Sequence, residues 1–445
     1  MGLDRLARRL VERLVELALA AIDPERRVAE ALSQREGRGP GGVPFGAALA
    51  LGKGAAALAR GAEPFLPPSC RRLLLRPHTS PALGLPGWEE HSGGHPVPDA
   101  ASVAAGERLF AWLSGLAPDQ PLLALVSGGA SAAIELPAAG LTLYDLAATQ
   151  SALLRGGVAI DGVNAVRKHL SRLKGGGGLR VGDVGGIGRA PILALLLSDV
   201  PGDDPAVLAS GPFAADPSTF ETALAALTHL RSEIPAAVLA HLAAGARGEV
   251  PETVKPGDPA LGRVETVLLA GVRTAAQAVA AALSRLGFAV ETGDLAGEAA
   301  PAGRDLVARG RALPGETVAR VLGGETTVTL GPGSGIGGRN QELALAAAEV
   351  LAGSPDEAVL ALASDGEDGP TRAAGAVVDG ESWKAIRKAG VDPALALRRH
   401  DSHTALAALP GALLTTGPTG TNTADVVVYL RFRGEPAAEW DSMPP

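Results

Sequence analysis

The sequence predicts an α/β fold with two domains, each a sheet covered by helices, and two observations lead to this prediction. Short apolar runs alternate with alanine-rich helical segments along nearly all of the 445 residues. Most of these runs end in Gly, Ser or Asp and lead into a helix, which is the pattern of parallel strands in βαβ units. We therefore expect parallel strands joined by helices that cover the sheet.

The domain boundary is placed at the polar, proline-containing stretch 247–259, which has the composition of a linker. The N-terminal domain then covers residues 1–245 and the C-terminal domain residues 260–435. The first domain should contain a doubly wound sheet, and such sheets bind ligands in the loops after the carboxyl ends of strands. The second should be a further βα series, from the apolar run 264–270 through 326–330, 358–364 and 412–417 to a last strand at 424–430.

Charge and cysteine content exclude several classes of function. The formal net charge is -8 and the pI is about 5.6, so nothing indicates the clustered basic surface that binds nucleic acid. Cys70 is the only cysteine, which excludes an internal disulfide and a cysteine-based metal site. A single cysteine also fits a reducing compartment, and we expect the cytoplasm.

The first 20 residues start basic and turn apolar, as a signal peptide does, but Glu12 and Glu16 interrupt the apolar run. Leu10, Leu14 and Leu17 recur at helical spacing, which predicts an amphipathic helix on the domain surface. No uncharged apolar stretch reaches the ~18 residues that a membrane span needs, so no membrane partner is expected.

Lysine is rare, with six among the 40 basic residues, and three of the six lie in distinctive motifs. In such an arginine-rich chain, a retained lysine marks a place where a planar fork cannot replace a compact ammonium. Lys53 lies between two glycines at the end of an expected strand, where its ammonium could reach a phosphate. The segment is not a Walker A loop, and a surface lysine at a turn is the alternative.

A second glycine-containing loop follows the expected strand at 122–126. Its small residues let backbone N–H groups converge on an anion, and the start of the following helix adds a favourable dipole. The alternative is a tight turn from strand to helix. The loop consists of Ser127, Gly128, Gly129, Ala130 and Ser131.

Basic residues gather in the segment 164–176. Arg167, Lys168, Ser171 and Lys174 recur at spacings of three and four, which predicts that they share one side of a helix. The glycines after Lys174 indicate close approach to a ligand, whereas a solvated basic face is the alternative.

Carboxylates follow the most apolar run of the chain, at 198–204. Asp199 and Asp203 are hard oxygen ligands of the kind that Mg²⁺ prefers, and Mg²⁺ normally takes one or two carboxylates and keeps its water. Formation of a Pro-Gly-Asp turn explains part of the pattern equally well.

The second domain contains a literal G-x-G-x-x-G at Gly333, Gly335 and Gly338, with Asp365 ending the next expected strand. This pattern is typical of nicotinamide-dependent enzymes. Polar side chains at 339–341 argue against it, because a dinucleotide fold packs the helix tightly on the sheet at that point.

Three more clusters in the second domain are rich in acidic, hydroxyl and glycine residues, and each follows an expected strand. They are 323–326, 364–369 and 416–422. Clusters of this kind on one sheet edge predict a polar cleft, and ordinary turns are the alternative.

Seven motifs, in the expected order along nearly the whole chain, resemble those of the glycerate 2-kinase family, the class II glycerate kinases. They are SGGASA, NAVRKHLSRLKGG, LLLSDVPGDDPAVLASGP, GGETTV, GGRNQELAL, SDGEDGP and TTGPTGTNTAD. The C-terminal part of this family is known as the MOFRL domain, and some members were formerly labelled hydroxypyruvate reductases.

The resemblance implies ATP-dependent phosphorylation of D-glycerate to 2-phosphoglycerate with Mg²⁺. It implies a cleft between a larger Rossmann-like domain and a smaller C-terminal α/β domain. The family's catalytic lysine and arginine fall on Lys53 and Arg339. Two departures affect details of ligand contact: Arg372 stands where the family usually has an acid, and residues 400–403 replace a more usual Asn-Asp-Ser-Tyr.

Phosphoryl transfer needs the phosphates positioned and their charge neutralised. We expect the loop 127–131 to hold an anionic group, and Lys53 and Arg339 to act on the transferring phosphoryl group. One basic side chain among Arg167, Lys168 and Lys174 should hold the substrate carboxylate, because a charge-assisted pair fixes its orientation. Glu325 and Asn340 are further candidates for substrate or phosphate contact, and Asp199 with Asp203 or Asp365 should hold the metal.

Two rival functions stay open at this stage. The glycine fingerprint at 333–338 motivates an NAD(P)-dependent hydroxypyruvate reductase, and the same cleft could belong to a nucleotide-binding sensor without catalysis. Formation of a homodimer is also left open.

Overall fold

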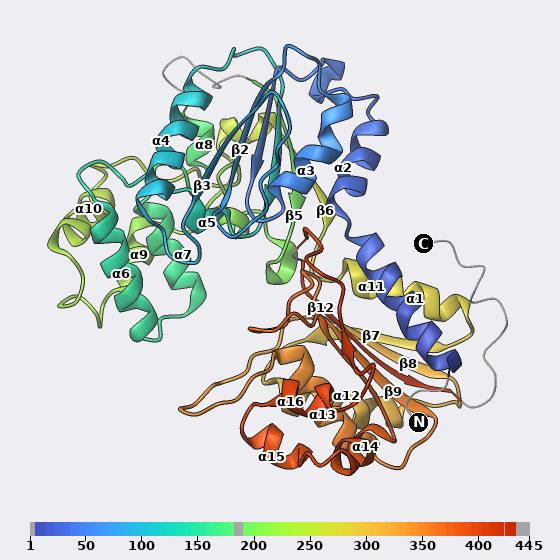
Figure 1. Ribbon diagram of the computed structural model, residues 1–445. Coiled ribbons are helices and arrows are strands. Elements are labelled where there is room, and N and C mark those ends of the chain that lie inside the picture. The colour runs from blue at the N-terminus through green and yellow to red at the C-terminus, as the bar shows by residue number, and fades with distance from the viewer. Residues whose placement is uncertain (1–4, 182–189, 422, 433–445) are drawn as a thin grey trace. The chain divides into compact units, whose positions relative to one another are not determined.

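The computed structural model describes residues 5–181, 190–421 and 423–432. Contacts divide the chain into two compact units (Figure 1). One unit is Pro24–Leu269, and the other contains the chain up to Asp23 together with the chain from Ala270 onward. Among the described residues, no helix is both long and apolar enough to cross a membrane.

The unit Pro24–Leu269 is built on a six-stranded sheet of order β3-β2-β1-β4-β5-β6, in which β1 to β5 pair in parallel. β1, β4 and β5 are buried along their whole length, which explains why they are continuous apolar runs rather than alternating ones. The strands are β1 (Ala47–Leu51), β2 (Arg71–Pro77), β3 (Trp88–Gly93), β4 (Leu122–Ser127), β5 (Ile192–Leu197) and β6 (Val264–Ala270).

The prediction that the run 264–270 opens the second domain was wrong, because β6 lies beside β5 in the first sheet. The expected linker before it is packed into the same unit. Val254 is fully buried, its N–H donates to Gly175 O at 3.0 Å, and its carbonyl accepts from Asp216 N–H at 2.7 Å. Composition alone does not reveal such tertiary contacts.

Nine α-helices are described in this unit. Four of them, α6, α7, α9 and α10, share a separate apolar core away from the sheet (Figure 1). The helices are α2 (Pro24–Ser33), α3 (Ala55–Ala62), α4 (Ala100–Ser114), α5 (Ala130–Ala133), α6 (Leu143–Arg155), α7 (Ile160–His169), α8 (Gly177–Arg180), α9 (Phe220–Ala226) and α10 (Ala236–Ala246).

The second unit has a mixed sheet of order β11-β10-β9-β12-β8-β7. Only β7 and β8 pair in parallel there, and the remaining pairs are antiparallel. The strands are β7 (Ala289–Leu295), β8 (Val318–Gly324), β9 (Glu357–Leu362), β10 (Gly375–Asp379), β11 (Leu413–Leu414) and β12 (Asp425–Arg431).

The strand expected at 326–330 is not formed, and the strand of this region, β8, ends at Gly324. Beyond Gly324, the pairing with the chain after β7 is reduced to one isolated bridge between Glu298 and Thr327. Glu325 N–H donates to Leu295 O at 3.1 Å, and Thr327 N–H donates to Gly297 O at 2.8 Å. The β-branched residues that favour a strand here are overridden by these contacts.

Helix α13 is central to the second unit, and nearly all of its residues are buried. It packs against α12 and against β9 and β10. The amphipathic N-terminal helix was predicted correctly, but α1 packs on α11 of this unit rather than on the N-terminal domain. The helices are α1 (Arg5–Ala21), α11 (Thr274–Arg285), α12 (Ala299–Ala312), α13 (Arg339–Leu351), α14 (Ser382–Lys388), α15 (Pro393–Arg398) and α16 (Ser402–Ala407).

Candidate active site

In the first unit, the loops after β1 and β4 lie side by side, since Leu51 pairs with Val126 in the parallel register. Hydrogen bonds join them: Lys53 N–H donates to Gly128 O at 2.8 Å, and Gly54 N–H donates to Ser127 Oγ at 2.9 Å. Ser127 Oγ in turn donates to Leu51 O at 3.0 Å. The Ser127 hydroxyl therefore holds the two loops together.

Glycine is required where these loops touch. Gly52 has φ 101°, and a Cβ there would collide with the Ser127 carbonyl oxygen. Gly129 has φ 81° and caps the start of α5, and a Cβ there would lie 2.8 Å from Lys53 Cγ. The lysine side chain therefore runs over Gly129. Among the residues that the structure describes, its ammonium forms no ion pair.

Asp199, which follows β5, lies against the same loop, because a Cβ on Gly128 would collide with its carboxylate. Asp203 lies four residues further on, with φ 53°. Within the described ranges, no three His, Cys, Asp or Glu side chains gather as a metal site. One or two carboxylates are what Mg²⁺ normally takes from a protein, so Asp199 beside an anion loop fits that ion. Asp365 belongs to the other unit.

The prediction that residues 167–174 share one helix face was wrong, because α7 ends at His169. Lys168 and Lys174 lie in buried ion pairs instead. Lys168 Nζ is 3.2 Å from Asp216 Oδ1, with side chains 6% and 0% exposed. Lys174 Nζ pairs with Glu135, and both side chains are at most 5% exposed. The described contacts thus assign both lysines to the interior of the protein.

Arg167 is the basic residue of this segment that faces the loop 127–131. Its Nη2 donates to Ser131 Oγ at 3.0 Å and lies 3.4 Å from Ser131 O. Burial lowers the pKa of the guanidinium, and the charge of Glu135 partly offsets this. A half-buried cation whose described close contacts are neutral groups is suited to binding an anionic ligand.

The glycine run after Lys174 contacts protein backbone, which corrects the expectation that it approaches a ligand. The N–H groups of Gly175, Gly176 and Gly178 donate to the carbonyls at 210–212, at 2.9, 2.7 and 3.0 Å. Side chains would prevent this docking, because a Cβ on Gly178 would lie 2.7 Å from Pro212 O.

His95 was missed by the sequence analysis. It follows β3, and its pKa is lowered by burial and by the charges of Lys53 and Arg167. The imidazole is therefore neutral at pH 7 and belongs to the same electrostatic cluster. The only sequence signal for it is a Gly-Gly-His after a short strand, which is weak by itself.

In the second unit, Arg339 begins α13 and is held by two carboxylates. Its Nε and Nη2 lie 2.5 and 2.9 Å from the two oxygens of Asp425, and its Nη1 lies 2.6 Å from Glu325 Oε1. Burial lowers the pKa of the guanidinium, but the bond with Asp425 and the nearby carboxylate charges together raise it by more, so Arg339 stays charged. Asp425 was also missed, although an acid directly before an apolar run marks it.

The start of α13 is occupied by a protein carboxylate. Asp368 accepts from the backbone N–H groups of Asn340 and Gln341 at 3.0 and 2.8 Å. A Cβ on Gly338 would collide with it. Asn340 is fully buried, and its side-chain amide lies on Asp368. The helix start is thus filled where a dinucleotide fold would place the pyrophosphate, and no strand forms at 326–330 before it.

The three polar clusters of the second unit lie at one sheet edge, as expected. Gly324 at the end of β8 pairs with Asp425, and Leu362 at the end of β9 pairs with Val426 and Gly375. Gly375 in turn pairs with Leu414 at the end of β11. Asn422, in the third cluster, lies outside the described residues.

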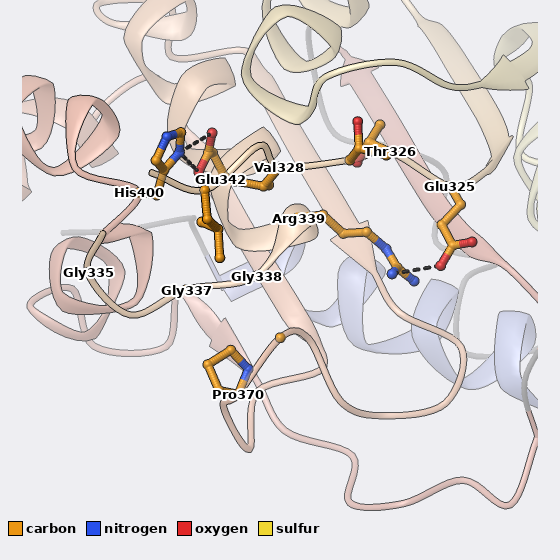
Figure 2. Close-up of a pocket in the computed structure, with 13 residues that line it drawn as sticks. Glu325, Thr326, Val328, Gly335, Gly337, Gly338, Arg339, Glu342, Pro370 and His400 are labelled. Carbon is orange, nitrogen blue, oxygen red and sulfur yellow. Dashed lines mark hydrogen bonds and ion pairs between the residues drawn. The ribbon is translucent and has the colours of Figure 1, made fainter. Parts of the chain in front are cut away.

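A cavity of about 540 Å³ adjoins this edge, with Arg339 pointing toward Glu325 at one end and His400 beside Glu342 at the other (Figure 2). His400 Nδ1 is 2.9 Å from Glu342 Oε2, and His403 Nδ1 is 2.8 Å from Gln341 Oε1. Burial raises the pKa of Glu342, and His400 partly offsets this. The two histidines that depart from the family pattern thus contact α13.

Residues 10–243 match a domain of unknown function, DUF4147, and residues 318–425 match the MOFRL family. A glycerate 2-kinase of Pyrococcus horikoshii is 39% identical over 348 residues, which cover 76% of each chain. The chain belongs to the glycerate 2-kinase family. The crystal structure of a glycerate kinase from Thermotoga maritima superposes with a TM-score of 0.84, at 34% identity, covering 95% of this chain and 99% of that one.

One relative carries a different, provisional name. A protein of Agrobacterium vitis named as a hydroxypyruvate reductase is 38% identical and covers 96% of this chain and 95% of its own length. A reductase of this kind would need a dinucleotide site. In this member of the glycerate 2-kinase family, residues 333–338 do not form one, because the carboxylate of Asp368 occupies the start of α13.

Proposed function

We propose that this protein transfers the terminal phosphoryl group of ATP to the 2-hydroxyl group of D-glycerate, with Mg²⁺, in the cytoplasm. The observation that carries the proposal is the cluster at the carboxyl edge of the first sheet. It combines the ammonium of Lys53, which has no ion pair among the described residues, with the glycine loop 127–131, the half-buried guanidinium of Arg167 and the carboxylate of Asp199. Such a cluster supports phosphoryl transfer, which depends on positioning and charge neutralisation.

Arg167 is assigned to the carboxylate of glycerate. Lys168 and Lys174, the other two candidates, are already paired with buried acids. The planar fork of Arg167 can bind a carboxylate through two parallel hydrogen bonds, which fixes the hydroxyl group that accepts the phosphoryl.

Lys53 and Arg339 are assigned to the transferring phosphoryl group. Among the described residues, the ammonium of Lys53 has no ion-pair partner that it must lose before it binds a phosphate. Arg339 keeps one edge of its fork on Asp425, which is 1% exposed, while its other edge touches Glu325, which is 58% exposed. A phosphate oxygen can replace the exposed carboxylate, so Asp425 would orient the arginine and Glu325 would be exchanged for the nucleotide.

Asp199, with Asp203 from the same loop, is assigned to Mg²⁺. When bound there, the ion would neutralise the negative charge of the phosphates. The free thiol of Cys70 is buried, and burial raises its pKa to about 11, which suits an inert residue in a reducing compartment. Light scattering of the protein in solution would show whether it forms a homodimer.

The direct test is phosphorus NMR of the protein with glycerate and MgATP. We expect ADP and 2-phosphoglycerate to appear together, which reports the activity and the position phosphorylated. Oxidation of NADH by hydroxypyruvate with pure protein would support the reductase instead. Nucleotide binding without glycerate-dependent release of ADP would support the sensor.

A further inference from the structure

Three consecutive residues after β5 adopt left-handed backbone conformations. Ala209, Ser210 and Gly211 have φ 53°, 60° and 62°. Glycine adopts this conformation without cost, but a residue with a Cβ is strained there, and two adjacent strained residues are unusual. Such strain persists only where the surroundings impose it, and it is concentrated at functional sites.

The surroundings that impose it are the glycine run 175–178. The carbonyls of Ser210, Gly211 and Pro212 accept hydrogen bonds from Gly175, Gly176 and Gly178. The backbone at 210–212 is therefore fixed from outside by three hydrogen bonds, and these hold the strained conformation.

The strained backbone fixes the position of the Ser210 hydroxyl group. Ser210 is 2% exposed, and its Oγ forms a hydrogen bond with Ser131 Oγ. Ser131 Oγ also accepts from Arg167 Nη2 at 3.0 Å. Among the described contacts of the Ser210 hydroxyl, Ser131 is the partner.

The Ser131 hydroxyl can form only a limited set of hydrogen bonds. A hydroxyl has one hydrogen to donate and two lone pairs that accept. If Ser210 donates to Ser131, both lone pairs of Ser131 are used, by Ser210 and by Arg167. The hydrogen of Ser131, a residue that is half-buried, is then left to donate to a third partner.

We propose that Ser210 is a positioning residue that turns Ser131 into a hydrogen-bond donor, so that Ser131 and Arg167 together bind the carboxylate of the 2-hydroxy acid substrate. This inference rests on the proposed glycerate kinase activity. It adds a two-residue carboxylate clamp and a strained backbone that sets its geometry. Selectivity for a carboxylate follows, because hydrogen bonds to a charged carboxylate are stronger than those to a neutral amide or alcohol.

The test uses two variants that both remove the hydroxyl but differ in strain. Ser210→Ala keeps the Cβ in the left-handed region, whereas Ser210→Gly relieves it. We expect both to raise KM for glycerate by the same factor, about tenfold or more, which is typical for loss of a hydrogen bond to a charged group. The kcat should change by less than about threefold, because the clamp holds substrate and transition state alike.

The two variants should differ in thermal stability although they share the same KM. Ser210→Gly should melt at a higher temperature than Ser210→Ala, since glycine accepts φ near 60° freely. Equal KM values at unequal Tm would show that the change in KM does not come from stability. Ala209→Gly is the matched control, which relieves the neighbouring strain, raises Tm and leaves KM unchanged.

A double mutant tests whether Ser210 acts through Ser131. Ser131→Ala should raise KM for glycerate, and adding Ser210→Ala should have little further effect, because the two changes remove one interaction. Wild-type KM in Ser210→Ala, additive effects in the double mutant, or a raised KM in Ala209→Gly would each overturn the inference. Absence of glycerate-dependent ADP formation in the wild type would instead refute the proposed function, before any variant is compared.

Discussion

Lys53 and Arg339, the two residues assigned to the phosphoryl group, lie in opposite electrostatic surroundings. The side chain of Lys53 runs over Gly129, and its ammonium has no ion pair among the described residues. The guanidinium of Arg339 is bound by two carboxylates. The lysine can therefore bind a phosphate directly, whereas the arginine must first release one of its two carboxylates. Substitutions of the two residues should have different consequences.

Lys53→Arg should lose about two orders of magnitude in kcat and keep the fold, since a planar fork cannot occupy the narrow space over Gly129. Steady-state kinetics and a thermal melt measure the two properties. Lys384→Arg, at a lysine that is 82% exposed, is the matched control and should be silent. Turnover near that of the wild type would show that Lys53 is a surface residue.

Arg339→Ala should lower kcat on the order of 10³-fold and raise KM for glycerate little, the pattern of lost transition-state stabilisation. Arg339→Lys should recover only a small part, because a point charge replaces a fork that Asp425 orients. Kinetics of both variants, with melts to confirm folding, decide the matter. A tenfold or larger rise in glycerate KM at unchanged kcat would reassign Arg339 to the substrate carboxylate.

At the scale of elements, the end of α7 decides what the basic segment does. Had the helix continued past His169, the lysines at 168 and 174 would share a side with Arg167. The chain instead turns, Arg172 N–H donates to Leu136 O at 2.8 Å, and the glycine run docks on 210–212. This turn sends Lys174 to Glu135 in the interior, whereas Lys168 reaches Asp216 from within α7 and Arg167 lies at the loop 127–131.

Lys168→Met should therefore destabilise the protein by about 3–5 kcal/mol, because it leaves the Asp216 carboxylate buried without its cation. Denaturant unfolding measures the change, and glycerate KM measured at a temperature where the variant is folded should stay within about twofold. Lys388→Met, at an exposed lysine, is the control. A large rise in KM with normal stability would return Lys168 to the substrate site.

At the scale of the whole molecule, the chain leaves one compact unit and later returns to it. α1 at the N-terminus packs on α11, which follows the complete first sheet in sequence. Leu10 and Leu14 are fully buried by this contact. The N-terminal helix is therefore part of the unit that carries Arg339, although it directly precedes the unit that carries Lys53.

Leu14→Ala should lower the free energy of unfolding by about 2–5 kcal/mol, the usual cost of removing a buried leucine side chain. Hydrogen exchange should increase in α11 and not in β1, β4 or β5. Glu16→Ala, which breaks a surface pair with Arg13, is the control and should change little. Faster exchange confined to the first sheet would contradict this grouping of α1.

Short-range patterns by themselves determined the strands that end at Leu51, Ser127 and Leu197, the polar loops after them and the start of α13. They did so because strand and turn preferences act within a few residues. The same patterns, with the family resemblance, singled out Lys53, Arg339 and the loop 127–131. The roles of these residues stay predictions until kinetics test them.

Only the tertiary structure decided which charges are paired, where β6 belongs and what the glycines at 175–178 approach. Asp216 and Glu135 neutralise lysines that lie 48 and 39 residues away in sequence, and no local signal encodes such a pair. The strain at Ser210 likewise exists only because a distant backbone segment holds it. Long-range contacts such as these depend on how elements pack together, and the physical chemistry of a short sequence window does not contain that information.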